Sequence, residues 1–150
     1  MAMRKSIFTL VGIVMATASV MASTVSDKDR AIRYEELPAD ARTFIKHHYP
    51  NEQPTYMWED KDHNHTEYKV VMANGVKLEF DERGNWTEVD TPNAMVPADI
   101  VPKKIADYVA KKYPANKIVE ISKERNEWEV KLNNGTELEF DHEYHLVKVD

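Results

Sequence analysis

The spacing of apolar residues predicts a helix after each of two prolines, Pro38 and Pro102. In both segments apolar side chains recur at intervals of three and four residues, the period of a helix with one buried face. Proline suits the first turn of a helix because its missing N–H would have no partner there. A second proline follows each segment, at Pro50 and Pro114. It should end each helix, because the residue before proline disfavours the helical region.

Downstream of each helix the period changes from about four to two, which predicts strands. Apolar and polar side chains alternate over residues 67–72 and again over 127–132. The dipeptides Asn74-Gly75 and Asn134-Gly135 follow them, and Asn-Gly is typical of a type I′ hairpin turn. A returning strand and a short last strand should follow each turn, and one more strand should precede each hairpin. Each half of the chain is thus predicted to form a helix and four antiparallel strands.

The two halves of the chain share a series of motifs. Asn-Gly, Leu-Glu-Phe-Asp and Val-Asp follow one another in both. The offset between the halves is 64 residues at their start (101 − 37) and 60 at their end (149 − 89), so the first half holds four extra residues between Pro50 and Asn74. Such self-similarity is typical of a duplicated unit. The predicted fold class is therefore α+β, with two tandem helix-plus-four-stranded antiparallel sheet units at residues 32–90 and 91–150.

Units of about 60 residues bury little of their surface when they fold alone. Pairing edge to edge would remove one exposed edge from each sheet and merge the two small cores. We therefore expect joined sheets, both helices on one face, and residues 90–101 as the connector.

Residues 1–22 are predicted to be a secretory signal peptide. Arg4 and Lys5 precede an apolar run over residues 7–20, and Val20 and Ala22 supply the small side chains before a cleavage site. The run is shorter than the roughly 20 apolar residues of a spanning helix, so no membrane anchor is expected. We expect cleavage after Ala22, a flexible segment over residues 23–31, and a periplasmic or secreted protein.

Net charge limits the kinds of partner that are expected, and the cysteine content limits the source of the protein's stability. The full chain carries a net charge of −6, and loss of the leader leaves 18 basic residues (20 − 2) against 26 acidic ones, a net charge of −8. Nucleic acid is not an expected partner, because binding it depends on neutralising phosphates with Lys and Arg. The chain has no cysteine, so its stability must come from a continuous core without disulfides.

The leader, the paired helix-and-strand segments and the recurring motifs resemble the PepSY-like family of bacterial periplasmic proteins, described as similar to β-lactamase-inhibitor proteins. The resemblance spans residues 32–150. It implies a helix-backed sheet whose open face binds another protein, and a role as inhibitor or regulator of an envelope enzyme. It implies no catalytic residues. The chain departs from the secreted β-lactamase inhibitors in having no cysteines.

Alternation places charged side chains, with an acidic excess, on the sheet face away from the helices. Trp86 and Leu146 are predicted on that face as well, where exposed aromatic residues often anchor interfaces. Tyr56 and Trp58 lie on an adjoining strand whose register the sequence leaves open. The alternatives are a solvated face and, for these four residues, a second minor core.

The four extra residues fall within 60–65, which is predicted to be a long polar loop that contacts a partner. Asp60, Asp62 and Asn64 match the start of a calcium loop, but the glycine and glutamate that complete it are missing. His63 and His65 alternate as a metal-binding pair would, yet structural zinc needs four ligands. We therefore predict no metal site and no cofactor. The candidate partner-binding residues are Tyr56, Trp58, Asp60, Asp62, His63, His65, Trp86 and Leu146.

The sequence contains none of the common catalytic motifs. It has no G-x-S-x-G, no H-E-x-x-H and no glycine-rich phosphate loop. His47 and His48 are adjacent on a predicted helix, where neighbouring side chains point about 100° apart, so they are not expected to act together. The sequence thus predicts a non-catalytic binding module whose partner is another exported protein. The alternative is a periplasmic protein that binds a cation, a small ligand or a peptide.

Overall fold

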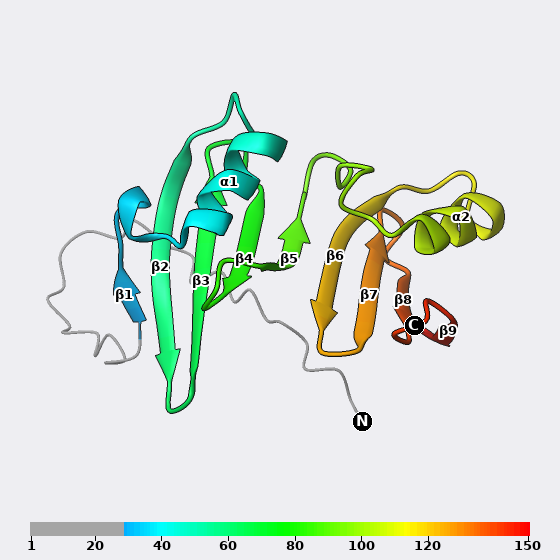
Figure 1. Cartoon of the computed structure of the whole chain (residues 1–150). Helices are drawn as coiled ribbons and strands as arrows, with labels where there is room; N and C mark the ends of the chain where they lie inside the picture. Colours follow the sequence, from blue (N-terminus) through cyan, green and yellow to red (C-terminus); the bar gives the residue numbers. More distant parts are fainter. Residues whose placement is uncertain (1–28) are drawn as a thin grey trace, which may run out of the picture.

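The computed structural model describes residues 29–150, and its main element is a single antiparallel sheet. Its nine strands follow one another across the sheet in chain order (Figure 1). The strands are β1 (Asp29–Ala31), β2 (Pro54–Asp62), β3 (His65–Met72), β4 (Lys77–Asp81), β5 (Trp86–Asp90), β6 (Ile118–Glu124), β7 (Glu127–Leu132), β8 (Glu137–Phe140) and β9 (Leu146–Val149). The helices are η1 (Tyr34–Glu36), α1 (Ala39–His48) and α2 (Lys103–Lys112).

The predicted signal peptide, residues 1–22, lies outside the described residues. Within residues 29–150, no helix has the length and apolar character needed to cross a bilayer.

The helices predicted after Pro38 and Pro102 are confirmed as α1 and α2. Each proline immediately precedes its helix. Each helix also ends where the Tyr-Pro signal predicts, and the N–H groups of Tyr49 and Tyr113 donate to carbonyls four residues back, at 2.8 Å in both cases. Local sequence signals therefore suffice to place both helices.

The hairpins at the two Asn-Gly dipeptides are confirmed, but their turn type differs from the prediction. A type I′ turn needs positive φ at both central residues. Here Gly75 and Gly135 have φ of 88° and 89°, whereas the described non-glycine residues with positive φ are Arg125 and Tyr144. The Gly75 N–H donates to the Met72 carbonyl at 2.9 Å. Each connection is therefore a three-residue loop in which glycine alone takes the left-handed conformation.

The prediction of two helix-plus-four-stranded units is wrong, because all nine strands belong to a single sheet that does not divide into two units of four. β5 pairs with β6 along Glu88–Ser122, Val89–Ile121 and Asp90–Glu120. At the N-terminal edge of the sheet, β1 adds a strand that the alternation of apolar and polar side chains did not predict. Side-chain periodicity identifies strands, but it does not show where a sheet ends, since backbone groups do the pairing. The result is one uninterrupted sheet.

The predicted connector also belongs to this sheet's core. Its Thr91 and Val96 N–H groups donate to carbonyls of Val119 and Ile118, at 2.8 and 2.9 Å. Val96 and Ile100 are buried, at 1% and 7% exposure, in the same core as the residues of both halves. The connector therefore joins the two halves through backbone hydrogen bonds and a shared core.

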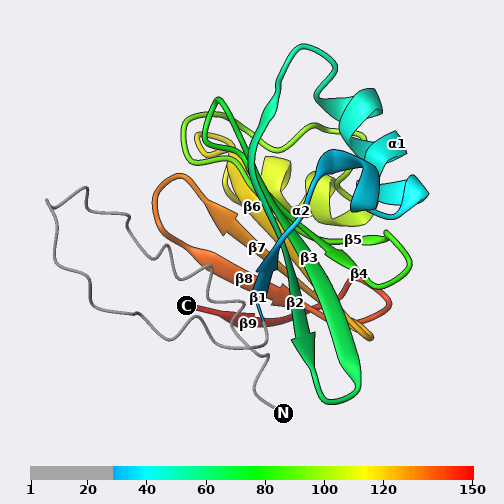
Figure 2. The same cartoon turned by 90° about the vertical axis from the view of Figure 1, so that its left-hand side faces the viewer.

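Both helices pack on one face of the sheet (Figure 2). The Phe44 ring of α1 meets Phe80 of β4 edge to face at 5.5 Å, and the Tyr108 ring of α2 meets Phe140 of β8 at 5.6 Å. We call the opposite side the open face, because no described helix or loop covers it (Figure 2).

Two matching turns close the β4–β5 and β8–β9 hairpins. The Oδ1 atom of Asp81 accepts the N–H groups of Arg83 and Asn85, both at 2.9 Å. Asp141 accepts those of Glu143 and His145 in the same way, also at 2.9 Å. Short side chains that satisfy backbone donors in this way stabilise tight turns.

Candidate functional site

The register of β2 against β3 fixes which β2 residues lie on the open face. Val70, opposite Met57, is buried beneath the helices, so the even-numbered β2 residues face the other way. We define the β2 strip as Tyr56, Trp58, Asp60 and Asp62, which share the open face. Tyr56 is 58% exposed. The β2 strip therefore presents two aromatic residues beside two carboxylates.

Residues 60–65 do not form the long loop that was predicted. β2 continues through Asp62 and β3 begins at His65, so only His63 and Asn64 make the turn. The β6–β7 hairpin has a two-residue turn as well, between Glu124 and Glu127. The extra residues instead lengthen both strands, because cross-strand backbone pairing can extend through polar residues that are exposed on both faces.

The side chains at this hairpin tip have local partners. His65 Nε2 lies 2.9 Å from Glu67 Oε1, and the backbone N–H of His63 donates to Asp62 Oδ1 at 2.9 Å. Asp60 Oδ2 lies 3.9 Å from Lys69 Nζ. Burial, followed by the nearby Asp60 carboxylate, raises the pKa of Asp29. The tip is thus an exposed, charged surface.

Trp86 and Leu146 do not lie on the open face, so their predicted placement is wrong. Trp86 pairs with Phe80 and its ring lies 6.4 Å from Phe44 of α1. Leu146 pairs with Phe140 and packs against the core. Each strand pair contains a β-bulge beside this position, between Glu79 and Phe80 in the first case. A bulge adds one residue and so reverses the alternation that the prediction used.

Carboxylates gather on the open face where β5 meets β6. Asp90 and Glu120 are directly opposite each other. Burial raises the pKa of Asp90, and burial followed by the charge of Asp90 raises that of Glu120. Lys77 Nζ lies 3.9 Å from Asp90 Oδ2 and offsets part of this charge. The middle of the open face is therefore acidic.

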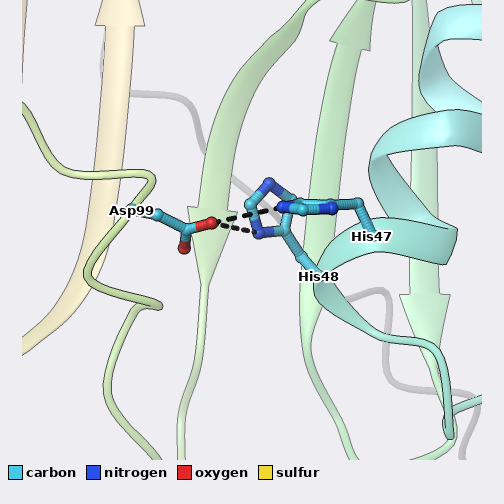
Figure 3. Close-up of side chains that lie close together, drawn as sticks. All are labelled: His47, His48 and Asp99. Atoms are coloured by element: carbon cyan, nitrogen blue, oxygen red, sulfur yellow. Dashed lines mark ion pairs between the residues drawn. The ribbon is translucent and has the colours of Figure 1, made fainter.

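On the helix-covered side, a cluster of two histidines and one aspartate joins α1 to the connector (Figure 3). His47 Nε2 lies 3.4 Å and His48 Nδ1 lies 3.5 Å from the same Asp99 oxygen, Oδ2. Both rings nevertheless reach the same Asp99 oxygen at the end of α1, so the two histidines share a partner. Nothing in the local sequence pairs Asp99 with these histidines.

The two imidazoles of this cluster have different environments. The His47 side chain is 69% exposed and that of His48 only 13%. Burial lowers the pKa of His48, and the Asp99 carboxylate opposes that shift. His48 therefore favours the neutral form, which has a lone pair available.

A second group of potential ligands lies in the β8–β9 turn. His145 Nδ1 is 3.4 Å from Asp141 Oδ2 and 3.6 Å from Glu143 Oε2. Within residues 29–150, this group and the His47, His48 and Asp99 cluster are the sets of three whose donor atoms converge. Asp141 already serves the turn, and the backbone N–H of His145 is the main cause of its lowered pKa.

The sequence matches a family model, and the fold is similar to several solved structures. The PepSY-like family model, described as beta-lactamase-inhibitor-like, matches residues 66–148. A periplasmic protein of the DUF2874 family from Bacteroides vulgatus is 39% identical, with 83% of this chain and 98% of that chain covered and a TM-score of 0.81. A "putative calcium-regulated periplasmic protein" from Bacteroides thetaiotaomicron is 38% identical, with coverage of 81% and 96% and a TM-score of 0.79. No curated protein matches the chain.

Proposed function

The chain belongs to the PepSY-like family, and from that premise we propose that it is a periplasmic, non-catalytic protein that binds another exported protein through the open face of its sheet. Similar proteins of known structure are described as periplasmic, which supports the location. The family description supports inhibition or regulation of an envelope enzyme as the outcome of binding.

The observation that carries the proposal is the extent of the open face. Nine strands form one surface that no described element covers (Figure 2). A specific protein interface needs about 800 Å² from each partner, and the backbone of a preformed surface usually moves little on binding. Tyr56 and Trp58 provide aromatic side chains of the kind that dominate binding energy at interfaces.

Charge indicates what kind of protein surface would fit. The open face carries Asp60 and Asp62 on the β2 strip, and Asp90 and Glu120 at the β5–β6 junction. Complementary potentials accelerate association and exclude wrong partners. The proposed partner therefore presents a basic patch to this face.

The test is capture of partners from an envelope extract of the producing cell on immobilised protein. Tyr56→Ala/Asp62→Ala removes one aromatic and one acidic side chain from the β2 strip. The matched control, Lys104→Ala/Lys111→Ala, changes two exposed α2 residues on the other face. We expect a partner that wild type and control retain and the β2-strip variant loses. Equal retention by all three proteins would contradict binding through this surface.

Export can be tested separately from binding. We expect the protein in the periplasmic fraction, with an intact mass that corresponds to cleavage after Ala22. A cytoplasmic, full-length product would contradict this part of the proposal.

Cation binding is the second candidate function, and one observation favours it. A relative at 38% identity is described as calcium-regulated, and calcium prefers carboxylate oxygens such as those of Asp90 and Glu120. Calorimetric titration with calcium of wild type, Glu120→Gln and Asp62→Ala distinguishes the two functions. Saturable binding that Glu120→Gln weakens and Asp62→Ala leaves intact would support calcium at the β5–β6 junction. Absence of saturable heat would leave protein binding as the function of this face.

A further inference from the structure

The end of α1 brings three donor atoms together from two distant parts of the chain. His47 Nε2 and His48 Nδ1 lie 3.4 and 3.5 Å from Asp99 Oδ2, and all three donor atoms are within 4.8 Å of one another. Nitrogen and oxygen ligands of zinc lie about 2.0–2.2 Å from the metal, so the edges of a tetrahedral site measure about 3.4 Å. The two nitrogen–oxygen separations match those edges.

From this geometry we propose that His47, His48 and Asp99 bind a divalent transition-metal ion of the zinc class, which links the end of α1 to the connector before α2. The donor set identifies the class of metal. Two imidazoles and one carboxylate suit zinc, copper or nickel, whereas calcium and magnesium select sites built from oxygen alone. Three protein ligands leave a fourth position for water or for a group from a partner.

A simple ion pair explains the geometry less well. Charge-assisted hydrogen bonds between nitrogen and a carboxylate are usually about 2.7–2.9 Å long, and both contacts here are longer. One carboxylate oxygen can accept a hydrogen bond from each ring even when both imidazoles are neutral, so the length of the contacts is what distinguishes the two arrangements.

Tyr49 provides a second, independent observation. Its side chain is buried, at 9% exposure, and its hydroxyl has no hydrogen-bond partner among the described residues. The hydroxyl lies near enough to Asp99 for that carboxylate to act on it electrostatically. Buried hydroxyl groups rarely lack a partner. The metal ion itself accepts no hydrogen bond, but water in its fourth position would give this hydroxyl a partner.

The position of the site gives it a structural consequence. His47 and His48 end α1, whereas Asp99 belongs to the segment that leads into α2. A bound ion would tie these two segments together on the helix-covered side, away from the open face. Metal binding and partner binding through the open face can therefore be measured separately.

The experiment is calorimetric titration of zinc into tag-free, metal-free protein at pH 7.5, with visible absorption of the cobalt form as a second readout. The variants His47→Ala and Asp99→Asn change exposed side chains, so they should fold, which circular dichroism will verify. His145→Ala is the matched control, because it removes the imidazole of the other convergent group.

We expect wild type and His145→Ala to bind one zinc ion with the same affinity, and His47→Ala and Asp99→Asn to bind at least tenfold more weakly. Cobalt should give the intense visible bands of a tetrahedral site in wild type and lose them in the two variants. Equal affinity in all four proteins, binding lost only in His145→Ala, or no saturable binding by wild type would each overturn the proposal.

Discussion

The two halves of the molecule place opposite charges at corresponding positions under the helix-covered face. In the first half Glu59 of β2 is opposite Tyr68 of β3. In the second half Lys123 of β6 is opposite Trp128 of β7. These positions match in the sequence offsets of 64 (123 − 59) and 60 (128 − 68), yet one holds a carboxylate and the other an ammonium group.

The first half stabilises its carboxylate with cations. Glu59 is 6% exposed, and its oxygens lie 3.0 Å from Lys61 Nζ and 3.5 Å from Arg30 Nη2. Arg30 comes from β1, so the added edge strand supplies part of this network. Burial, and then Glu59 itself, raises the pKa of Tyr68.

The second half stabilises its ammonium group with aromatic faces. Lys123 Nζ lies 4.1 Å from the ring centroid of Trp86 and 5.7 Å from that of Trp128. The Trp128 ring contacts Tyr144 at 5.6 Å, so the aromatic group extends to the β8–β9 turn. A shared backbone pattern thus fixes where a charge can sit on the helix-covered face, while neighbouring side chains decide its sign.

The largest expected difference between the halves is at the turns. Gly84 has φ of 89°, and a Cβ there would lie 2.8 Å from both the Ala41 nitrogen and the Pro38 Cβ. We expect Gly84→Ala to lower the free energy of unfolding by about 3 kcal/mol or more, from backbone strain and overpacking against α1. Urea denaturation measures this change.

The control for that prediction is Gly135→Ala. Gly135 also has φ of 89°, but no atom of the described residues lies within 4 Å of the position that a Cβ would occupy. We expect a loss of about 1 kcal/mol, from backbone conformation alone. Similar losses in both variants would show that the close approach of α1 to Gly84 contributes nothing. The residue of the second half that corresponds to Gly84, Tyr144, tolerates φ of 67° beside Trp128.

Removing the buried charge of Glu59 and the half-buried charge of Lys123 should have smaller and unequal effects. Glu59→Gln keeps the shape but leaves Lys61 without this carboxylate and Arg30 with Glu36 alone, so we expect a loss of about 2 kcal/mol. Lys123→Met loses a cation–π contact of about 1 kcal/mol, but it also removes the cost of burying an ammonium group. The free energy of unfolding of Lys123→Met should therefore differ from that of wild type by less than about 1 kcal/mol. Chemical denaturation that ranks the two variants in the reverse order would contradict this account.

The smallest expected effect is a dependence of stability on alkaline pH. Burial lowers the pKa of Lys123 from its ordinary 10.5, and Asp81 opposes that shift. Between the lowered pKa and 10.5 the unfolded chain binds more protons than the folded one, so the contribution of Lys123 to stability increases as pH rises through this window.

The difference between wild type and Lys123→Met isolates that contribution. Tyr49 and Tyr68 have raised pKa values and act in the opposite direction, but they are present in both proteins. Urea denaturation between pH 7.5 and 10.5 should show wild type gaining stability relative to the variant. A constant or shrinking difference would contradict burial of the Lys123 ammonium group.

Sequence reasoning succeeded where the signal is local. The prolines at 38 and 102 locate both helices, and alternation over residues 67–72 and 127–132 locates β3 and β7. It failed where one backbone detail changes the outcome, since a single β-bulge moves Trp86 from the open face to a contact with Phe44. It also missed Asp99, because only the folded connector brings that residue to His47 and His48.

The hydrogen-bonded junction of β5 and β6 has a consequence for cooperativity. Backbone pairing crosses it at Val89 and Ile121, and Val96 and Ile100 of the connector add their side chains to one common core. Neither half could open without exposing edges and apolar surface that belong to the other. Thermal unfolding should therefore follow a single calorimetric transition, and a chain cut within residues 91–101 should yield no independently folded fragment.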